Sequence, residues 1–199
     1  MERLGIFGGT FDPPHLGHLI LADEAYTQLR LNRLLWVLTP DPPHKQNQEI
    51  SPAMQRLELV QAAIGDNPHF ELSRVELDRP GPHYAVDTVD LLQARFPGAE
   101  LFYLIGGDSL HDLVTWSRPS ELIERVASLG VMRRPDVEID LGDIEKALPG
   151  ITSKIIFIDT PPIDIASHEI RERIASGQSY RYYLHPAVYD LIRQCHYYL

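Results

Sequence analysis

The 199-residue sequence is poor in cysteine and has no long hydrophobic run. Its single cysteine, Cys195, excludes a disulfide bond within the chain, and no cysteine motif surrounds it. Such a low cysteine content is typical of proteins of the reducing cytoplasm, which is the location we expect. No apolar stretch is long enough for a signal-peptide core or a membrane span, so we expect neither.

Positive charge is also scarce in this chain. It has 18 lysine and arginine residues against 28 aspartate and glutamate residues, a formal net charge of −10. A chain of this charge has no general attraction for nucleic acids or anionic lipids, so we expect no nucleic-acid partner and no membrane partner. Any anion must therefore bind at a local site.

The composition, with 44% hydrophobic and 23% charged residues, supports a core of ordinary size, and we expect one domain over residues 1–199. Short aliphatic runs predict buried strands at residues 4–7, 34–38, 101–105, 129–132 and 155–158, with a further strand at 70–77. Amphipathic patterns predict helices at residues 16–31, 52–64, 85–96, 119–126 and 186–198. Ser51 is expected to cap the second of these helices, with Pro52 in its first turn.

Strands that alternate with helices imply right-handed crossovers and a parallel sheet. We therefore predict an α/β fold, with a Rossmann-like, doubly wound and mostly parallel sheet covered by helices on both faces. Residues 39–50, 78–83 and 133–150 are rich in proline, glycine and aspartate, and we interpret them as loops over the carboxyl edge of the sheet. Ligands bind at that edge in open α/β folds.

The most informative segment, residues 8–18, follows the first strand and opens the first helix, with the sequence Gly-Gly-Thr-Phe-Asp-Pro-Pro-His-Leu-Gly-His. Gly8 and Gly9 permit positive φ angles and allow an anion to approach the backbone. His15 and His18 are three residues apart, so both rings can lie on one side of the helix start. Gly17 between them leaves room for a ligand. The segment predicts an anion site at a helix N-terminus.

Other interpretations of this segment are weaker. It matches neither the Gly-x-Gly-x-x-Gly pattern of dinucleotide-binding folds nor the P-loop pattern. His15 and His18 could be metal ligands, but no third histidine or cysteine stands at a suitable spacing, and we expect no protein-bound metal. They could also be solvated residues at a helix end. Their position directly after the first strand of an α/β chain favours a functional site.

Residues 8–18 resemble the signature of the His-x-Gly-His nucleotidyltransferase superfamily, and the whole chain is similar to the nicotinate-nucleotide adenylyltransferases within it. The resemblance implies an enzyme that joins ATP to nicotinic acid mononucleotide (NaMN) in NAD biosynthesis, with Mg²⁺ carried by the ATP phosphates. It implies that His15 and His18 are catalytic. The ATP-binding residues that it implies are Gly8, Gly9, Thr10, Phe11, His15, His18, Gly106, Asp108, Ser167 and Arg171.

The same resemblance implies four residues at the NaMN site. They are Lys45 in a Pro-Pro-His-Lys segment, Thr88 at a helix start, Trp116 in a short connection, and Arg134, for which its neighbour Arg133 is an alternative. Lys45 and the arginines could instead be solvated side chains. Thr88 could serve only the helix start, and Trp116 could belong to the core or a lid.

The last family motif departs from the pattern. Family members resemble Ile-Ser-Ser/Ala-Thr-x-Ile-Arg, whereas residues 165–171 read Ile-Ala-Ser-His-Glu-Ile-Arg. Ser167 and Arg171 are retained, but Ala166 and His168 replace two hydroxyl residues. We expect a helix that Ser167 caps, with backbone donors for phosphate and His168 as a substitute donor.

Alternative functions remain at this stage. Pantetheine-phosphate adenylyltransferases resemble the chain near residues 9–13 but usually have threonine in place of His15. Nicotinamide-nucleotide adenylyltransferases of the archaeal type begin differently. A nucleotide-sensing module with a relic site is a third alternative, and a homo-oligomer is compatible with the sequence.

The expected mechanism needs no general base, because a phosphate monoester is already largely dianionic near pH 7. The role left for the two histidines is to stabilise negative charge on the ATP phosphates, and we expect His18 to contact the α-phosphate.

Overall fold

The computed structural model describes residues 1–42, 49–132 and 140–199. Six parallel strands form one sheet in the order β3-β2-β1-β4-β5-β6, which confirms the predicted fold class. The strands are β1 (Arg3–Gly9), β2 (Arg33–Leu38), β3 (Phe70–Ser73), β4 (Glu100–Gly106), β5 (Ser128–Met132) and β6 (Ile155–Ile158). The chain first winds outward from β1 to β3, and then returns to the other side of β1 with β4. The order therefore reverses between β1 and β4, which is where ligands bind in such sheets.

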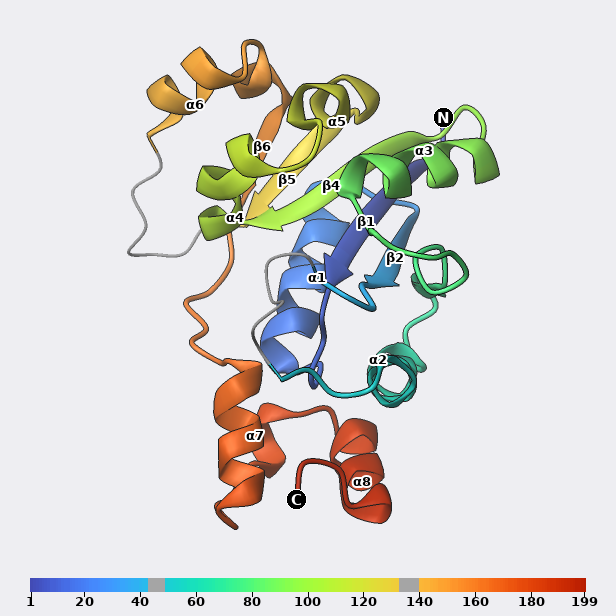
Figure 1. Cartoon of the computed structure of the whole chain (residues 1–199), viewed down its shortest axis with the longest axis vertical. Coiled ribbons are helices and arrows are strands. Elements are labelled where there is room, and N and C mark those ends of the chain that lie inside the picture. The colour runs from blue at the N-terminus through green and yellow to red at the C-terminus, as the bar shows by residue number, and fades with distance from the viewer. Residues whose placement is uncertain (43–48, 133–139) are drawn as a thin grey trace.

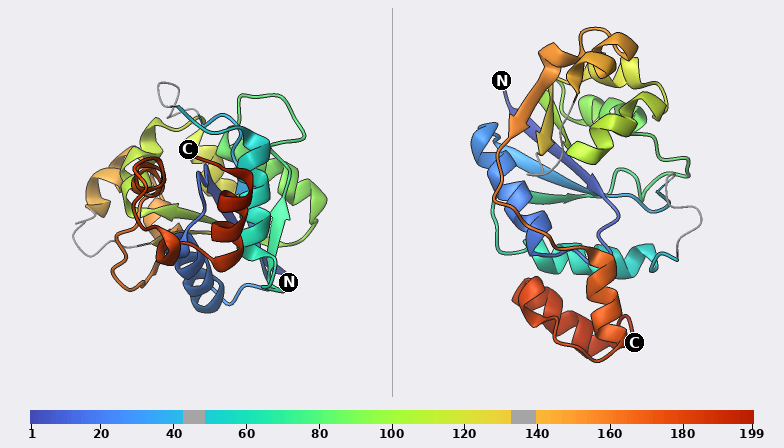
Figure 2. Two further views of the ribbon diagram at one scale, coloured as in Figure 1. Left: turned by 90° about the horizontal axis from the view of Figure 1, so that it is seen from below. Right: turned by 90° about the vertical axis from the view of Figure 1, so that its left-hand side faces the viewer.

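Helices cover both faces of the sheet (Figures 1 and 2). One core contains side chains of α1 (Leu16–Gln28), α2 (Ala53–Ile64), α7 (Ser167–Ala175) and α8 (Pro186–Cys195). The other contains side chains of α3 (Ala85–Arg95), α4 (Gly107–Asp112), α5 (Pro119–Arg125) and α6 (Leu141–Ala147). Short 3₁₀ turns cover Leu113–Thr115, Ile151–Lys154 and Arg181–Tyr183. In Figure 1, α7 and α8 form one end of the molecule and α6 lies at the other.

Several predicted element boundaries are wrong. The strand predicted for 70–77 ends at Ser73, the first helix ends at Gln28, and the last helix ends at Cys195. Helix α6 lies inside a segment that we predicted to be a loop, where Asp140 accepts a hydrogen bond from the Gly142 amide at the helix start. The glycine, proline and aspartate content favoured a loop in the sequence prediction, whereas Asp140 caps the helix and Ile144 packs into the core.

Two predicted caps are also wrong. Pro52, not Ser51, is the cap residue of α2, and Ala166, not Ser167, is the cap residue of α7. The backbone of Ser51 bonds to Asp12 and Arg56, and the hydroxyl of Ser167 donates to the Pro13 carbonyl. Both serines therefore join segments that are distant in the sequence.

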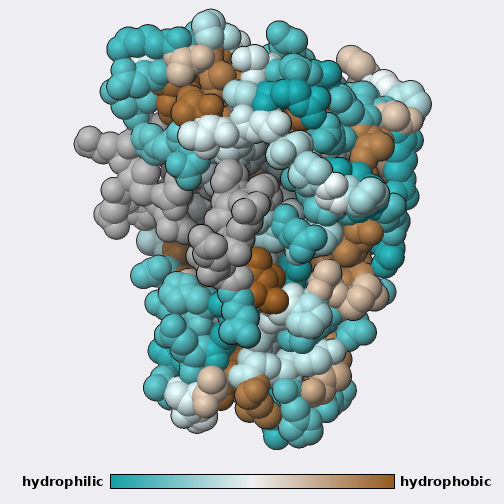
Figure 3. All heavy atoms as spheres, in the orientation of Figure 1, coloured by the Kyte–Doolittle hydropathy of each residue, from teal (hydrophilic) through white to brown (hydrophobic). Residues whose placement is uncertain are grey.

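Hydrophobic side chains are scattered over the face of the molecule that Figure 3 shows. In Figure 3 the hydrophobic residues of the visible face form separate patches among hydrophilic ones. The large exposed hydrophobic side chains come from different elements, among them Met54, Leu91 and Ile156. Within the described ranges, no helix combines the length and the apolar composition needed to cross a membrane.

Candidate active site

Two cavities open where the sheet order reverses. The β1–β2 pairing continues to Gly9 and Leu38, but the β1–β4 pairing ends at Phe7 and Leu104, so the carboxyl ends of β1 and β4 diverge. The first cavity has a volume of about 820 Å³ and the second about 630 Å³, sizes that suit nucleotides. Among the described residues, Thr10, Gly106 and Met132 line both cavities. The cavities therefore meet at the ends of β1, β4 and β5.

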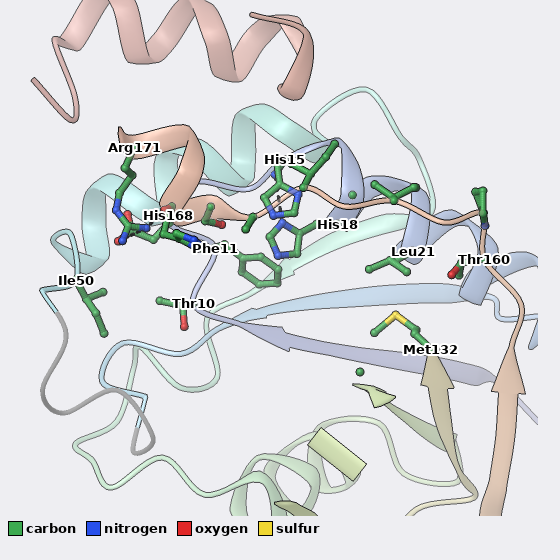
Figure 4. Close-up of a pocket in the computed structure, with 18 of the residues that line it drawn as sticks. Thr10, Phe11, His15, His18, Leu21, Ile50, Met132, Thr160, His168 and Arg171 are labelled. Carbon is green, nitrogen blue, oxygen red and sulfur yellow. Dashed lines mark hydrogen bonds and ion pairs between the residues drawn. The ribbon is translucent and has the colours of Figure 1, made fainter. Parts of the chain in front are cut away.

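The first cavity lies between the β1–α1 loop and the segment before α7 (Figure 4). Arg171 and His168 are at one end of the view, the rings of His15 and His18 are in the middle, and Leu21 and Thr160 are at the other end. Ile163 and Ile165 also line it. The cavity thus has one polar end and one partly apolar end.

The two histidines stack on one another at the start of α1. Their ring centroids are 3.7 Å apart, and the His18 ring also meets the Phe11 ring edge-on at 5.1 Å. The backbone N–H of His15 donates to Nδ1 of His18 at 3.2 Å. A neutral His18 ring therefore carries its proton on Nε2, which makes this atom a hydrogen-bond donor.

His15 is held as a neutral ring. Its side chain is buried, and burial lowers the pKa of the imidazole to about 4. A β-carbon on Gly17 would lie 3.0 Å from Nδ1 of His15, so the space beside Gly17 accommodates this ring. Gly17 also lines the first cavity, so the prediction that it leaves room for a ligand stays a prediction. His15 can act near neutral pH only as a polar group without charge.

The last two residues of β1 are glycines, and Gly9 has a packing role. Gly8 and Gly9 permit positive φ angles, but neither adopts one. A β-carbon on Gly9 would lie 2.7 Å from the ring of Phe11, two residues further along the chain. Phe11 itself has a φ angle of +49°. The missing side chain allows the chain to turn back over its own strand and present Phe11 to His18.

Ser167 and Arg171 bind the β1–α1 loop. Arg171 Nη1 donates to the Asp12 carbonyl at 2.7 Å, and Ser167 Oγ donates to the Pro13 carbonyl at 2.9 Å. Both residues line the first cavity, as does His168, which is exposed. They are therefore close to a ligand in this cavity and at the same time hold α7 against the loop that carries the histidines.

The second cavity is lined by Trp116 and by the start of α3. The Trp116 ring meets Tyr103 edge-on, with centroids 6.2 Å apart, and Tyr84 and Ala85 bring the α3 N-terminus to the same wall. This N-terminus has no side-chain cap. Its amide groups and the helix dipole favour an anion at that wall.

Thr88 lies behind the second cavity and does not line it. Its hydroxyl is buried and donates to Oε1 of Glu76 at 2.6 Å. Glu76 itself lines the cavity, and burial raises its pKa against the opposing effect of the Thr88 and Thr39 hydroxyls. Glu76 was not predicted as a site residue, because it lies after a strand in a segment that contains no motif.

The remaining predicted residues fall in different places. Gly8 and Gly9 line the second cavity, not the first, whereas Thr10 and Gly106 line both. Asp108 is the second residue of α4, and its side chain lies outside the described part of the structure. Lys45, Arg133 and Arg134 also lie outside the described residues. Their assigned roles stay predictions.

A parallel sheet with a histidine-lined cavity at its switch point is the arrangement of a nucleotidyltransferase, and the comparisons with known proteins agree. The family model described as cytidylyltransferase-like matches residues 6–173. A probable nicotinate-nucleotide adenylyltransferase of Thermomicrobium roseum is 47% identical over 92% of this chain and 85% of its own length. The nicotinate-nucleotide adenylyltransferase of Bacillus subtilis is 40% identical over 88% of this chain and 87% of its own. The chain belongs to the nicotinate-nucleotide adenylyltransferase family.

Solved structures share the fold. Nicotinic acid mononucleotide adenylyltransferase of Plasmodium falciparum, complexed with NaAD, superposes with a TM-score of 0.81 at 18% identity. The same protein complexed with APC gives a TM-score of 0.80. Both comparisons cover 100% of this chain and 98% of the solved one.

Proposed function

We propose that this protein transfers the adenylyl group of ATP to nicotinic acid mononucleotide, forming the dinucleotide and pyrophosphate. The observation that carries this proposal is the pair of cavities that meet at Thr10, Gly106 and Met132. A reaction between two nucleotides requires two adjoining sites with their phosphate ends together, and the histidine pair lies in one of them, close to the junction. Membership of the family supports the same reaction.

ATP fits the first cavity with its phosphates near Arg171 and the histidines. Cationic and hydrogen-bonding groups gather there, while Leu21 at the opposite end of the cavity offers apolar surface for the adenine base. The positive end of the α1 dipole also favours phosphate near His15 and His18.

The chemistry needs positioning more than activation. An oxygen of the mononucleotide phosphate forms a bond to the α-phosphorus of ATP, while the bond from that phosphorus to the α–β bridging oxygen breaks. Pyrophosphate leaves with the electron pair. A phosphate monoester with a second pKa of about 6 is already largely dianionic at neutral pH, so no general base is required.

His18 is the residue that we assign to charge in the transition state. Its Nε2–H can donate to an oxygen of the reacting α-phosphate, where a preorganised donor lowers the barrier. His15 fixes the tautomer of His18 through its backbone N–H and packs against the ring. Burial keeps the His15 ring neutral near pH 7, so this ring contributes no charge to the pair.

The second cavity suits the acid form of the acceptor. We assign Trp116 to the pyridine ring and the α3 N-terminus at Tyr84 and Ala85 to the carboxylate. Glu76 lines the same cavity, but its Oε1 already accepts a hydrogen bond from the Thr88 hydroxyl. The neutral amide would lose the attraction of the helix dipole.

A divalent cation enters this proposal with the substrate. In the described part of the chain, no three histidine, cysteine, aspartate or glutamate side chains come together as a metal site. The Asp12 carboxylate beside the first cavity accepts hydrogen bonds from Ser51 and Tyr198, so it is committed to the fold. We assign Mg²⁺ to the triphosphate of ATP, whose oxygen atoms are the ligands that this cation prefers.

The test is a comparison of acceptors. ATP is incubated with the protein and with nicotinate mononucleotide, nicotinamide mononucleotide or phosphopantetheine, and pyrophosphate and the adenylylated product are both quantified. We expect the highest kcat/KM with the nicotinate compound. A preference for either of the other two acceptors, or no product with any, would overturn the proposal.

A further inference from the structure

Arg56 is a buried cation in the first turn of α2. Its side chain is 1% exposed, and arginine is rarely buried to this degree without a partner. The position is also unfavourable for a cation, because the N-terminus of a helix carries the positive end of its dipole. Its interactions must therefore offset both costs.

The guanidinium group donates to four backbone carbonyl oxygens. Nε donates to Ser51 at 2.8 Å, Nη1 to Thr10 and Thr39 at 2.9 Å each, and Nη2 to Pro40 at 2.7 Å. Burial lowers the pKa of Arg56, which the Asp12 carboxylate partly opposes. The charge is thus stabilised chiefly by peptide dipoles of loops.

The four carbonyl groups belong to the loops that form the two cavities. Thr10 follows β1 and lines both cavities, whereas Thr39 follows β2 and lines the second. Ser51 is the neighbour of Ile50, which lines the first. One rigid, planar group therefore joins the β1–α1 loop to both the start and the end of the β2–α2 connection, although Arg56 itself is not among the described residues that line either cavity.

We propose that Arg56 is a positioning residue that sets the separation of the two substrate cavities. The inference rests on the proposed function, because it supposes that both cavities hold nucleotides that react with each other. Reacting atoms must lie about 3–3.5 Å apart, and an error of about 1 Å can cost roughly 100-fold in rate. A residue that joins the loops controls this distance without touching either substrate.

The test uses Arg56→Lys, which keeps the charge but cannot bond four separate carbonyl groups. The full chain is assayed for kcat and for the dissociation constants of ATP alone, the mononucleotide alone and the dinucleotide product. The product spans both cavities, so its affinity depends on their separation. We expect kcat to fall by roughly 30- to 100-fold. We expect the product to bind about tenfold more weakly and each separate substrate to change by less than about threefold.

Arg3→Lys is the matched control. Arg3 also donates twice to a backbone carbonyl, that of Leu29, but at the amino end of β1, away from both cavities. We expect this variant to lose thermal stability with kcat and product affinity unchanged. If Arg56→Lys does not accumulate as folded protein, Arg56→Gln retains an amide donor without an unpaired buried charge.

Two results would overturn the inference. One is a lower melting temperature with normal kcat and normal product affinity, as in the control. The other is an equal loss of affinity for all three ligands, which would make Arg56 a general support of the fold. If the unaltered protein transfers no adenylyl group, it is the proposed function that fails, so the two failures are distinguishable.

Discussion

The imidazole of His18 lines the first cavity with Nε2 as its donor atom. Because Nδ1 accepts from the His15 backbone, the ring is oriented before ATP binds. We expect His18→Ala to lower kcat by roughly 10²–10³, the usual cost of removing one preorganised donor. The ATP dissociation constant should change much less. Steady-state kinetics and equilibrium ATP binding are the measurements, and normal kcat with a raised KM would limit His18 to ATP binding.

The buried ring of His15 should also make the stability of the protein depend on pH. Its folded pKa of about 4 lies below the ordinary value of 6.5, so between these two values the unfolded chain takes up a proton that the folded chain does not. The free energy of unfolding should therefore fall as the pH drops from 6.5 to 4, and His15 should account for at most about 3 kcal/mol of this fall. Well above pH 6.5, the contribution of His15 should no longer change with pH.

The measurement for this prediction is urea unfolding at several pH values between 4 and 7. His15→Asn lacks the titrating ring, so its unfolding free energy should decline less steeply over that range, whatever its absolute stability. Parallel curves for the two proteins would show that His15 takes up its proton equally well in the folded chain.

Among the elements, the connection after α4 is placed by packing against β4. Trp116 follows the turn Leu113–Thr115, and its ring rests edge-on against Tyr103. We expect Trp116→Ala to raise the KM for nicotinate mononucleotide by about tenfold, because aromatic pairs contribute about 0.5–1.5 kcal/mol beyond their buried area. The KM for ATP should stay nearly constant. Equal increases in both constants would contradict the assignment of Trp116 to the second cavity.

The sequence predicted which strands and helices form better than it predicted the residues at which they end. Each strand other than β3 was visible as a short aliphatic run, and the motif after β1 indicated where ligands bind. The end of α8 was not predictable, since His196 and Tyr198 adopt φ angles of +55° and +67° to bring the chain back to Asp12. Such a turn depends on a partner almost 190 residues away in the sequence.

The site was predictable only where residues followed the motif. Arg56 gave a weak signal, because it lies four residues before Val60 on the buried side of α2, where an apolar side chain is expected. Glu76 gave none, since its burial depends on α3 folding over it. Thr88 was predicted to contact the mononucleotide, and this role stays a prediction, since its hydroxyl bonds to Glu76 and Thr88 is not among the residues that line the cavity.

At the level of the whole molecule, the C-terminal segment is bound to the first loop. Tyr198 donates to Oδ1 of buried Asp12 at 2.9 Å, and burial beside this carboxylate raises the tyrosine pKa, so the hydroxyl keeps its proton. We expect Tyr198→Phe to lower the free energy of unfolding by about 1–3 kcal/mol, because a buried carboxylate oxygen loses its donor.

Tyr197→Phe is the matched control for this prediction. The Tyr197 hydroxyl also donates to a carboxylate at 2.9 Å, but its partner Glu58 is exposed and water can replace the hydroxyl. Its loss should cost less than about 0.5 kcal/mol. The free energies of unfolding of both variants are measured by chemical denaturation. Equal decreases in the two variants would mean that Asp12 finds another hydrogen-bond donor when the Tyr198 hydroxyl is removed.

The wall of the first cavity has a consequence for how activity arises during folding. Pro13 meets Ser167, and Asp12 meets both Arg171 and Tyr198, so each contact closes a loop of more than 150 residues. Loops of this length close late, because they restrict most of the chain for little local gain. A refolding chain would therefore regain its helices and its central strands while the ATP cavity still lacked one wall. Competence for adenylyl transfer would appear only with the slowest conformational phase, which makes the enzymatic reaction itself a reporter of complete folding.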